Sequence, residues 1–158
     1  MSILSPQNSI PDALPGPPFF GALLRVVWQH VRDRMLQAIH EAGFTDFQEA
    51  HFAVFSFPLP DGMRPSDLAR QKRMSRQAVN YLLSQLEDLG YVERRAATGS
   101  DRRLVYLTPR GHEVVAAIFG CLRQLHEQWS KEVGKERFDD FVDVLKQLST
   151  KAQEPTNG

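Results

Sequence analysis

The chain has 158 residues, and its 19 Lys and Arg balance 19 Asp and Glu, so it carries no net charge at pH 7. This length is enough for one domain with an ordinary hydrophobic core. The lone Cys121 suits a reducing cytoplasm without structural disulfides. No apolar run approaches the ~20 residues of a membrane helix, and nothing resembles a signal peptide. We therefore expect a cytoplasmic protein with no membrane partner.

The sequence of the first third of the chain predicts an extended N-terminal arm followed by two helices. Five prolines among residues 1–18 favour an extended N-terminal arm. A long helix is expected from about Phe19 to Ala42, ended by Gly43, and a second over roughly Asp46–Phe57, ended by Pro58. The apolar side of the first helix consists of Leu23, Leu24, Val27, Val31, Met35 and Ile39.

A helix-turn-helix is expected next. A short helix over Arg64–Gln71 has a proline in its first turn, where proline is tolerated. After a turn at Met74, the second helix runs from Ser75, a good N-cap, to Leu89 and ends at Gly90. One face of this second helix is apolar and comprises Val79, Leu82, Leu83, Leu86 and Leu89.

The opposite face of the second helix is polar without being strongly charged. It presents Arg76, Gln77, Asn80 and Ser84, with Tyr81 beside them. Arginine, glutamine and asparagine make paired hydrogen bonds to guanine or adenine edges in the major groove. The face therefore predicts sequence reading, with an ordinary solvated helix face as the alternative.

A two-stranded hairpin should follow, over Tyr91–Arg95 and Leu104–Leu107, with a basic tip between the strands. Asp101 can accept hydrogen bonds from a neighbouring arginine and hold it extended. Either Arg102 or Arg103 can then enter a narrow minor groove, where the negative potential favours guanidinium. The alternative is a charged tip that only prevents strand edges from pairing between molecules.

Positive charge is concentrated in this part of the neutral chain. Residues 64–110 hold ten basic residues, nine of them arginine, against five acidic ones, so the segment is +5 and the remainder −5. Such a partition favours a local phosphate-binding surface.

After the hairpin, Thr108 and Pro109 open a long helix to about Val133, which Gly134 breaks. A last helix carries Phe138, Phe141, Val142, Leu145 and Leu148, and residues 151–158 are expected to be a disordered tail. The fold class is thus mostly α with a small β-hairpin wing: a winged helix-turn-helix plus a helical dimerisation shell. A single subunit cannot bury all the apolar surface of two long terminal helices that flank so small a lobe. The surface that stays exposed favours a two-fold interface between subunits.

Five runs in residues 67–111 together resemble the MarR family of bacterial transcriptional regulators: Asp67–Ala69, Ser75–Val79, Leu86–Arg94, Asp101–Arg103 and Leu107–Gly111. The resemblance implies one domain over residues 19–150, with a DNA-binding lobe at 59–108 and a dimerisation shell at 19–58 and 109–150. It also implies a homodimer that places a recognition helix in each major groove and a wing at the minor groove. Arg64 departs from the family's usual polar cap, and the interval from Asp101 to Thr108 is shorter than in many members. Whether Arg102 or Arg103 is the minor-groove residue therefore stays open.

The expected function is a sequence-specific regulator of transcription, a repressor of a pseudo-palindromic duplex operator that a small ligand relieves. The DNA-binding residues should be Ser75, Arg76, Gln77, Asn80, Tyr81, Arg94, Arg95, Asp101, Arg102 and Arg103. The family commonly binds small, often aromatic anions between shell and lobe, and the candidates for such a pocket are Trp28, His30, His51, Phe55 and Phe57. The alternative is that the phenylalanines are core residues and that His30 and His51 are simply hydrogen-bonded; the phenylalanines in question are Phe47, Phe52, Phe55 and Phe57.

Other function classes have weaker support in the sequence. A winged-helix adapter that binds protein is the main alternative, and the arginine-rich wing argues against it. No phosphate loop, nucleophile elbow or paired metal motif indicates an enzyme or a cofactor. The pairs His40–Glu41 and His112–Glu113 lack the spacing of a metal site.

Overall fold

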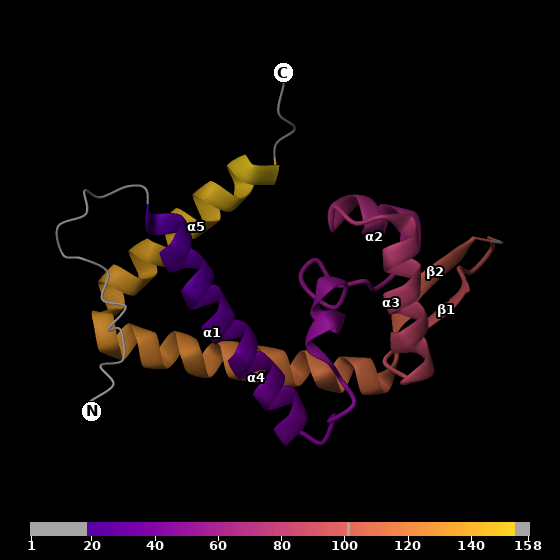
Figure 1. Cartoon of the computed structure of the whole chain (residues 1–158), viewed down its shortest axis with the longest axis horizontal. Helices are drawn as coiled ribbons and strands as arrows, with labels where there is room; N and C mark the ends of the chain where they lie inside the picture. Colours follow the sequence, from indigo (N-terminus) through magenta and orange to yellow (C-terminus); the bar gives the residue numbers. More distant parts are fainter. Residues whose placement is uncertain (1–18, 101, 154–158) are drawn as a thin grey trace, which may run out of the picture.

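The computed structural model describes residues 19–100 and 102–153. This part of the chain is mainly helical and holds one two-stranded antiparallel sheet (Figure 1). The expected proline-rich arm at 1–18, Asp101 and residues 154–158 lie outside the described residues. None of the helices in the described ranges is long and apolar enough to cross a membrane.

The long helices form as the sequence predicts. Helix α1 spans Phe20–Glu41, and Gly43 follows it with a left-handed φ of 100°. Helix α4 spans Pro109–Val133, and the Thr108 side chain caps it by accepting a hydrogen bond from the Gly111 amide at 3.0 Å. Helix α5 spans Lys135–Gln153, so the disordered tail predicted from residue 151 is wrong for residues 151–153.

The helix predicted over Asp46–Phe57 is wrong, because only the short 3-10 helix η2, Glu49–Ala53, forms there. Both Phe52 and Val54 are buried, although they would point about 200° apart on an α-helix at 3.6 residues per turn. Burial of side chains on opposite sides therefore favours a compact, irregular segment over an amphipathic helix.

The winged helix-turn-helix forms close to its predicted bounds. Helix α2 spans Pro65–Gln71, and helix α3 spans Arg76–Asp88. Strands β1, Val92–Ala96, and β2, Arg103–Leu107, pair antiparallel with Val92 opposite Leu107. An isolated antiparallel β-bridge joins Met63 to Val105 of β2. The fold is therefore the predicted one, with hairpin strands that start and end within one residue of expectation.

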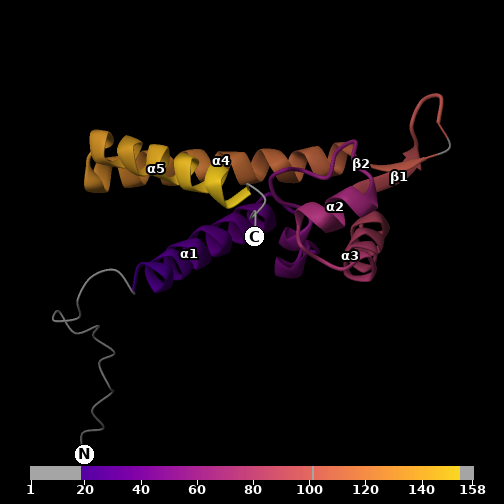
Figure 2. The same cartoon turned by 90° about the horizontal axis from the view of Figure 1, so that it is seen from above.

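Helix α4 joins the two ends of the molecule (Figure 1). The winged lobe lies at one end of α4, while α5 folds back along α4 at the other end, where the start of α1 also lies (Figure 2). One hydrophobic core runs from the second half of α1 through η2 and α3 to the N-terminal half of α4. The first half of α1 lies outside this core, and every residue from 19 to 30 is exposed.

A polar cluster fixes the start of α4 to the loop after α1. The Arg110 guanidinium donates to both carboxylate oxygens of Asp46 at 3.1 Å, and the Tyr91 hydroxyl donates to the same carboxylate. The hydrogen bond from Tyr91 and the charge of Arg110 hold the pKa of Asp46 below its usual value. Burial, followed by the hydrogen bond to Asp46, raises the pKa of Tyr91 to about 12. Close packing also requires glycine at Gly111, where an added Cβ would lie 2.1 Å from the Tyr91 carbonyl oxygen.

Candidate nucleic-acid interface

Helix α3 separates its apolar and polar faces as the sequence predicts. Val79, Leu82, Leu83 and Leu86 are buried in the core. On the other side, four residues expected to contact DNA are exposed: Arg76, Gln77, Asn80 and Tyr81. Ser75 acts as the N-cap, because its Oγ accepts a hydrogen bond from the Ala78 amide at 3.0 Å. The first turn of α3 is thereby anchored while its amide side chains face outward.

Arg94 is held against α3 and does not extend from the wing. Its guanidinium donates to Ser84 Oγ at 2.9 Å and, over longer distances of 3.4 Å, to Asn80 Oδ1 and Glu87 Oε1. The Arg94 backbone amide also donates to Glu87 Oε2 at 2.8 Å. Only 21% of this side chain is exposed, against 57% for its neighbour Arg95. Arg94 therefore ties strand β1 to helix α3, and its bond to Asn80 occupies only one of the two lone pairs of that side-chain carbonyl oxygen.

A second chain of hydrogen bonds reaches the polar face from the other side. His51 is 1% exposed, and its Nδ1 accepts from the Gln48 amide at 3.0 Å. This contact makes Nε2 the protonated nitrogen of a neutral ring, and Nε2 donates to Gln85 Oε1 at 3.2 Å. Gln85 Nε2 donates in turn to the Tyr81 hydroxyl at 3.0 Å. The exposed Tyr81 ring is thus positioned from η2 through two buried or half-buried polar side chains.

The wing presents basic side chains beyond the end of α3. Arg102 and Arg103 are exposed, and the Arg102 amide donates to Ser100 Oγ at 3.1 Å, which orders the turn. The guanidinium of Arg95 lies 3.9 Å from the centre of the Tyr106 ring and pairs with Glu93 at 3.0 Å. The expected contact of Asp101 with a neighbouring arginine lies outside the described residues.

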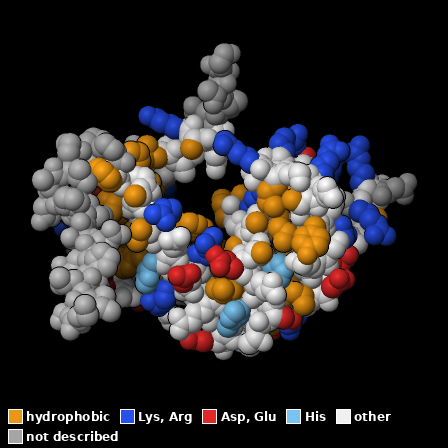
Figure 3. All heavy atoms as spheres, in the orientation of Figure 1, with side chains coloured by type: hydrophobic (Ala, Val, Ile, Leu, Met, Phe, Trp, Pro, Cys, Tyr) orange, Lys and Arg blue, Asp and Glu red, His pale blue; other side chains and the backbone are white. Residues whose placement is uncertain are grey.

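The basic residues of segment 64–110 divide into internal and external groups. Lys72, Arg94 and Arg110 have defined polar partners within the fold. The remaining seven are exposed: Arg64, Arg70, Arg73, Arg76, Arg95, Arg102 and Arg103. Lysine and arginine side chains gather along the upper right of Figure 3, where Figure 1 places α2, α3 and the wing. Positive charge therefore gathers on the side of the molecule that carries α2, α3 and the wing.

A largely apolar cavity of about 420 Å³ lies between α1, α4 and the segment after η2. Three of the five expected pocket residues, Trp28, Phe55 and Phe57, line it. The other two do not: His30 stacks on Trp129 with ring centres 6.2 Å apart, and His51 is committed to Gln48 and Gln85. The eight remaining lining residues were not among the expected ones: Met35, Phe52, Ser56, Leu59, Val115, Ile118, Phe119 and Leu122.

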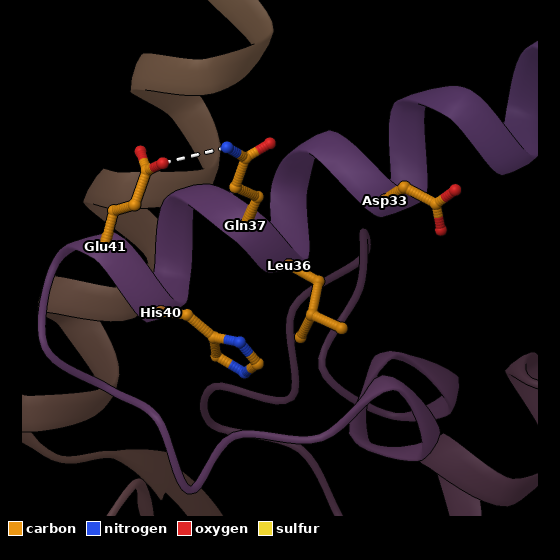
Figure 4. A pocket seen from close by; sticks show the side chains of 5 residues that line it. All are labelled: Asp33, Leu36, Gln37, His40 and Glu41. Carbon is orange, nitrogen blue, oxygen red and sulfur yellow. Dashed lines mark hydrogen bonds between the residues drawn. The ribbon is translucent and has the colours of Figure 1, made fainter.

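The remaining candidates for a ligand, metal or reactive site are a hollow beside α1, the potential metal-ligating side chains and Cys121. A hollow beside α1 takes all its lining from that one helix, and Figure 4 shows Gln37 bonded to Glu41 on one side with His40 on another. His40 Nε2 lies 2.7 Å from the Phe47 carbonyl oxygen. Within residues 19–100 and 102–153, no three His, Cys, Asp or Glu side chains gather as metal ligands. Cys121 is buried, and burial raises the pKa of its thiol, which disfavours the reactive thiolate.

Comparison with known proteins gives this geometry a family context. The sequence model of the MarR family matches residues 59–104. A MarR transcriptional regulator from Methanosarcina mazei Go1 has a similar structure, with a TM-score of 0.68 at 16% identity, over 89% of this chain and 93% of that chain. A mutant of MepR from S. aureus, bound to an oligodeoxyribonucleotide, gives 0.54 at 17% identity, over 85% and 98%.

A third similar structure is a MarR family protein of Mycobacterium tuberculosis in complex with salicylic acid. It gives a TM-score of 0.58 at 26% identity, over 87% of this chain and 98% of that chain. No curated protein matches the chain. The resemblance inferred from the sequence is confirmed: residues 59–104 match the family, and the chain has the winged-helix fold of MarR-family transcription regulators.

Proposed function

We propose that this chain, with the fold of MarR-family transcription regulators, is a homodimeric repressor that binds a pseudo-palindromic operator and that a small molecule relieves. The observation that carries the proposal is the pair of exposed amide side chains on α3, Gln77 and Asn80, in a segment with seven exposed arginines. Amides make paired hydrogen bonds to adenine, and arginines contact phosphates at any sequence. The surface therefore combines a reading element with a positioning element.

Dimerisation is supported by the apolar side chains at the far end of the molecule. On α1, Phe20 is 65% exposed and Leu23 is 54% exposed, and on α5 Leu148 is 57% exposed. Further exposed apolar side chains on the same two helices are Leu24, Val26, Val27, Phe141, Val144 and Leu145. Exposed apolar surface of this extent is typical of an interaction site. A second copy would cover both helices by the same two-fold contact and would leave both winged lobes free.

A selection from random duplexes, followed by a gel-shift titration, tests the DNA-binding proposal. We expect enriched sites to be two-fold symmetric, with half-sites about 10 base pairs apart, one helical turn. Gln77→Ala and Asn80→Ala should each reduce discrimination between operator and random duplex by about 1–3 kcal/mol. Asp88→Ala, an exposed change near the other end of α3, serves as the matched control and should leave discrimination unaltered.

The outcome that contradicts the proposal is equal binding to all duplexes at near-physiological salt, or a monomer at micromolar concentration. An adapter that binds protein would give the first result, because its basic wing would retain only salt-dependent, sequence-independent affinity.

A further inference from the structure

The cavity beside Trp28 has the shape of a small-molecule site but an unusual chemistry for one that would take an acid. Its volume of about 420 Å³ lies within the usual range of roughly 300–1,000 Å³ for ligand pockets. Trp28, Phe52 and Phe55 supply aromatic surface, and ten of the eleven lining residues are apolar. Ser56 is the single polar residue that lines it. Among the described residues, no charged side chain is part of this lining.

The hydroxyl of Ser56 is available as a hydrogen-bond donor. Lys72 Nζ donates to Ser56 Oγ at 3.0 Å, to the Ser56 carbonyl at 2.9 Å and to the Pro58 carbonyl at 3.1 Å. These three acceptors use the three N–H groups of the ammonium, so Lys72 has no donor left for a ligand. Because Ser56 Oγ accepts from Lys72, its own hydrogen is free to point toward an acceptor in the cavity.

Arg32, a cation on α1, is also engaged. Arg32 follows Trp28 by one helical turn and pairs with Glu49 of η2 at 2.6 Å. Its Nε is buried without a hydrogen-bond partner, but Arg32 is not part of the cavity lining. A carboxylate ligand would have to compete with Glu49 for this guanidinium or enter the cavity unpaired. Both routes carry the cost of removing a charge from water.

We propose that this cavity binds an uncharged, mainly aromatic molecule whose hydrogen-bond acceptor meets Ser56 Oγ, and that it discriminates against aromatic acids of the same shape. This inference rests on the proposed ligand response and names the ligand class for it. Apolar walls supply the affinity, while the single hydroxyl orients the ligand. A carboxylate finds neither a free ammonium nor a free guanidinium in the lining.

A matched pair of probes tests the ligand class directly. Naphthamide and naphthoate, substituted at the same ring position, share their two rings and differ in charge. Trp28 lines the cavity, so its fluorescence should report binding, and the background variant Trp129→Phe removes the second tryptophan, which lies outside the lining. We expect naphthamide to bind at least about tenfold more tightly than naphthoate to the DNA-free protein.

Variants of Ser56 and Arg32 locate the interaction. Ser56→Ala should weaken naphthamide binding by about threefold to tenfold, the usual effect of one neutral hydrogen bond, while Ser56→Thr retains the hydroxyl and should restore affinity. Thermal unfolding of each variant verifies that it is folded. Arg32→Gln should leave naphthamide affinity unchanged, because Arg32 is outside the lining.

Three results would overturn the proposal. Naphthoate binding as tightly as naphthamide, with loss in Arg32→Gln, would show an anion site. Failure of both probes to bind, with Trp28 fluorescence that changes with protein concentration, would show that a partner subunit fills the cavity. Failure of both probes without that change would show no ligand site of this class. Because every measurement omits DNA, a failure here is separate from a failure of operator binding.

Discussion

At the scale of single residues, the arginines of segment 64–110 have two distinct roles. The Arg94 guanidinium is held by Ser84 of α3, and the Arg110 guanidinium is held by Asp46 of the loop after α1. Arg102 and Arg103 are exposed on the wing. The sequence alone suggested that Arg94 contacts DNA, yet its guanidinium lies against Ser84 of the recognition helix. Its effect on DNA should therefore be transmitted through the position of α3.

Salt dependence separates these two roles. Arg102→Ala or Arg103→Ala should weaken binding to all duplexes and reduce the slope of log affinity against log salt by about 1 if a phosphate contact is lost. Arg94→Ala should instead lower discrimination and the free energy of unfolding, and leave the salt slope unchanged, because it frees Asn80 and Ser84. If Arg94→Ala reduced the slope of log affinity against log salt and left the free energy of unfolding unchanged, Arg94 would be a direct DNA contact.

The cluster of Asp46, Tyr91 and Arg110 predicts a pH dependence of stability. The pKa of Asp46 is lowered in the folded state, so its contribution is present above the ordinary value of 3.8 and is lost as the pH falls below it. Asp46→Asn should reduce the free energy of unfolding at neutral pH by up to about 1 kcal/mol, since the pair is partly exposed. Urea titrations of both proteins should show this difference shrinking toward acidic pH. A difference that does not change with pH would mean that packing, not charge, is what Asp46 contributes.

At the scale of secondary-structure elements, exposure divides α1 into two halves. Met35 and Ile39 in the second half are buried against the core, whereas the first half carries exposed Leu24 and Val27. Helix α5 contributes one buried side chain, Phe138, and an exposed apolar row that includes Leu148. These two faces are where a second copy of the chain is expected to bind.

Charge placed on either face should dissociate the dimer. Leu24→Glu and Leu148→Glu should each raise the dimer dissociation constant by about tenfold or more, because a carboxylate would be buried at the interface. Sedimentation velocity across a concentration series measures this change. Gln147→Glu introduces the same carboxylate on an adjacent exposed residue of α5 and serves as the control. Unaltered association in both leucine variants would place the dimer interface elsewhere.

At the scale of the whole molecule, the cavity and the recognition helix are joined through Lys72. This residue is the C-cap of α2, and its ammonium holds the Ser56–Pro58 segment that adjoins the cavity. Only Arg73 and Met74 separate it from Ser75, the N-cap of α3. A ligand that displaces this segment therefore acts on the turn between the two helices of the DNA-binding motif. Equal affinity for the DNA-bound and free arrangements would change nothing, so the ligand must prefer one of them.

The coupling between ligand binding and operator binding can be measured from either side, because each must change the affinity for the other by the same factor. A coupling of about 1–3 kcal/mol would weaken operator binding by roughly 5–150-fold when ligand is bound, and operator would weaken ligand binding by the same factor. Lys72→Met keeps an unbranched side chain of similar length but removes the ammonium that holds the Ser56–Pro58 segment, so it should reduce this factor. Calorimetry of naphthamide with and without operator tests both statements. Identical ligand affinity in the two titrations would remove the regulatory connection and leave DNA binding untouched.

The parts of the fold that depend on local interactions could be predicted from the sequence. Caps at Ser75 and Thr108, glycines at positions 43, 90 and 134, and the apolar spacing of α3 placed the long helices and the hairpin nearly at their observed bounds. These signals are local, because a cap or a left-handed glycine acts on its own turn of chain. The exposed polar face of α3 followed from the same periodicity.

Features that depend on contacts between distant segments could not be predicted, because those contacts exist only in the folded chain. Segment η2 is a 3-10 helix because Phe52 and Val54 are both buried, on different sides of the segment. The helical spacing of apolar residues in the sequence does not predict this burial. The inward positions of Arg94 and Arg110, and the bonding of His51 to Gln85, depend on partners 7 to 64 residues away. Ser56 and Lys72 gave no sequence signal for the cavity, because each is an ordinary polar residue until folding brings them 3.0 Å apart. The sequence pattern thus specified the helices and strands. Packing between them determined which polar side chains form hydrogen bonds within the fold and which stay exposed.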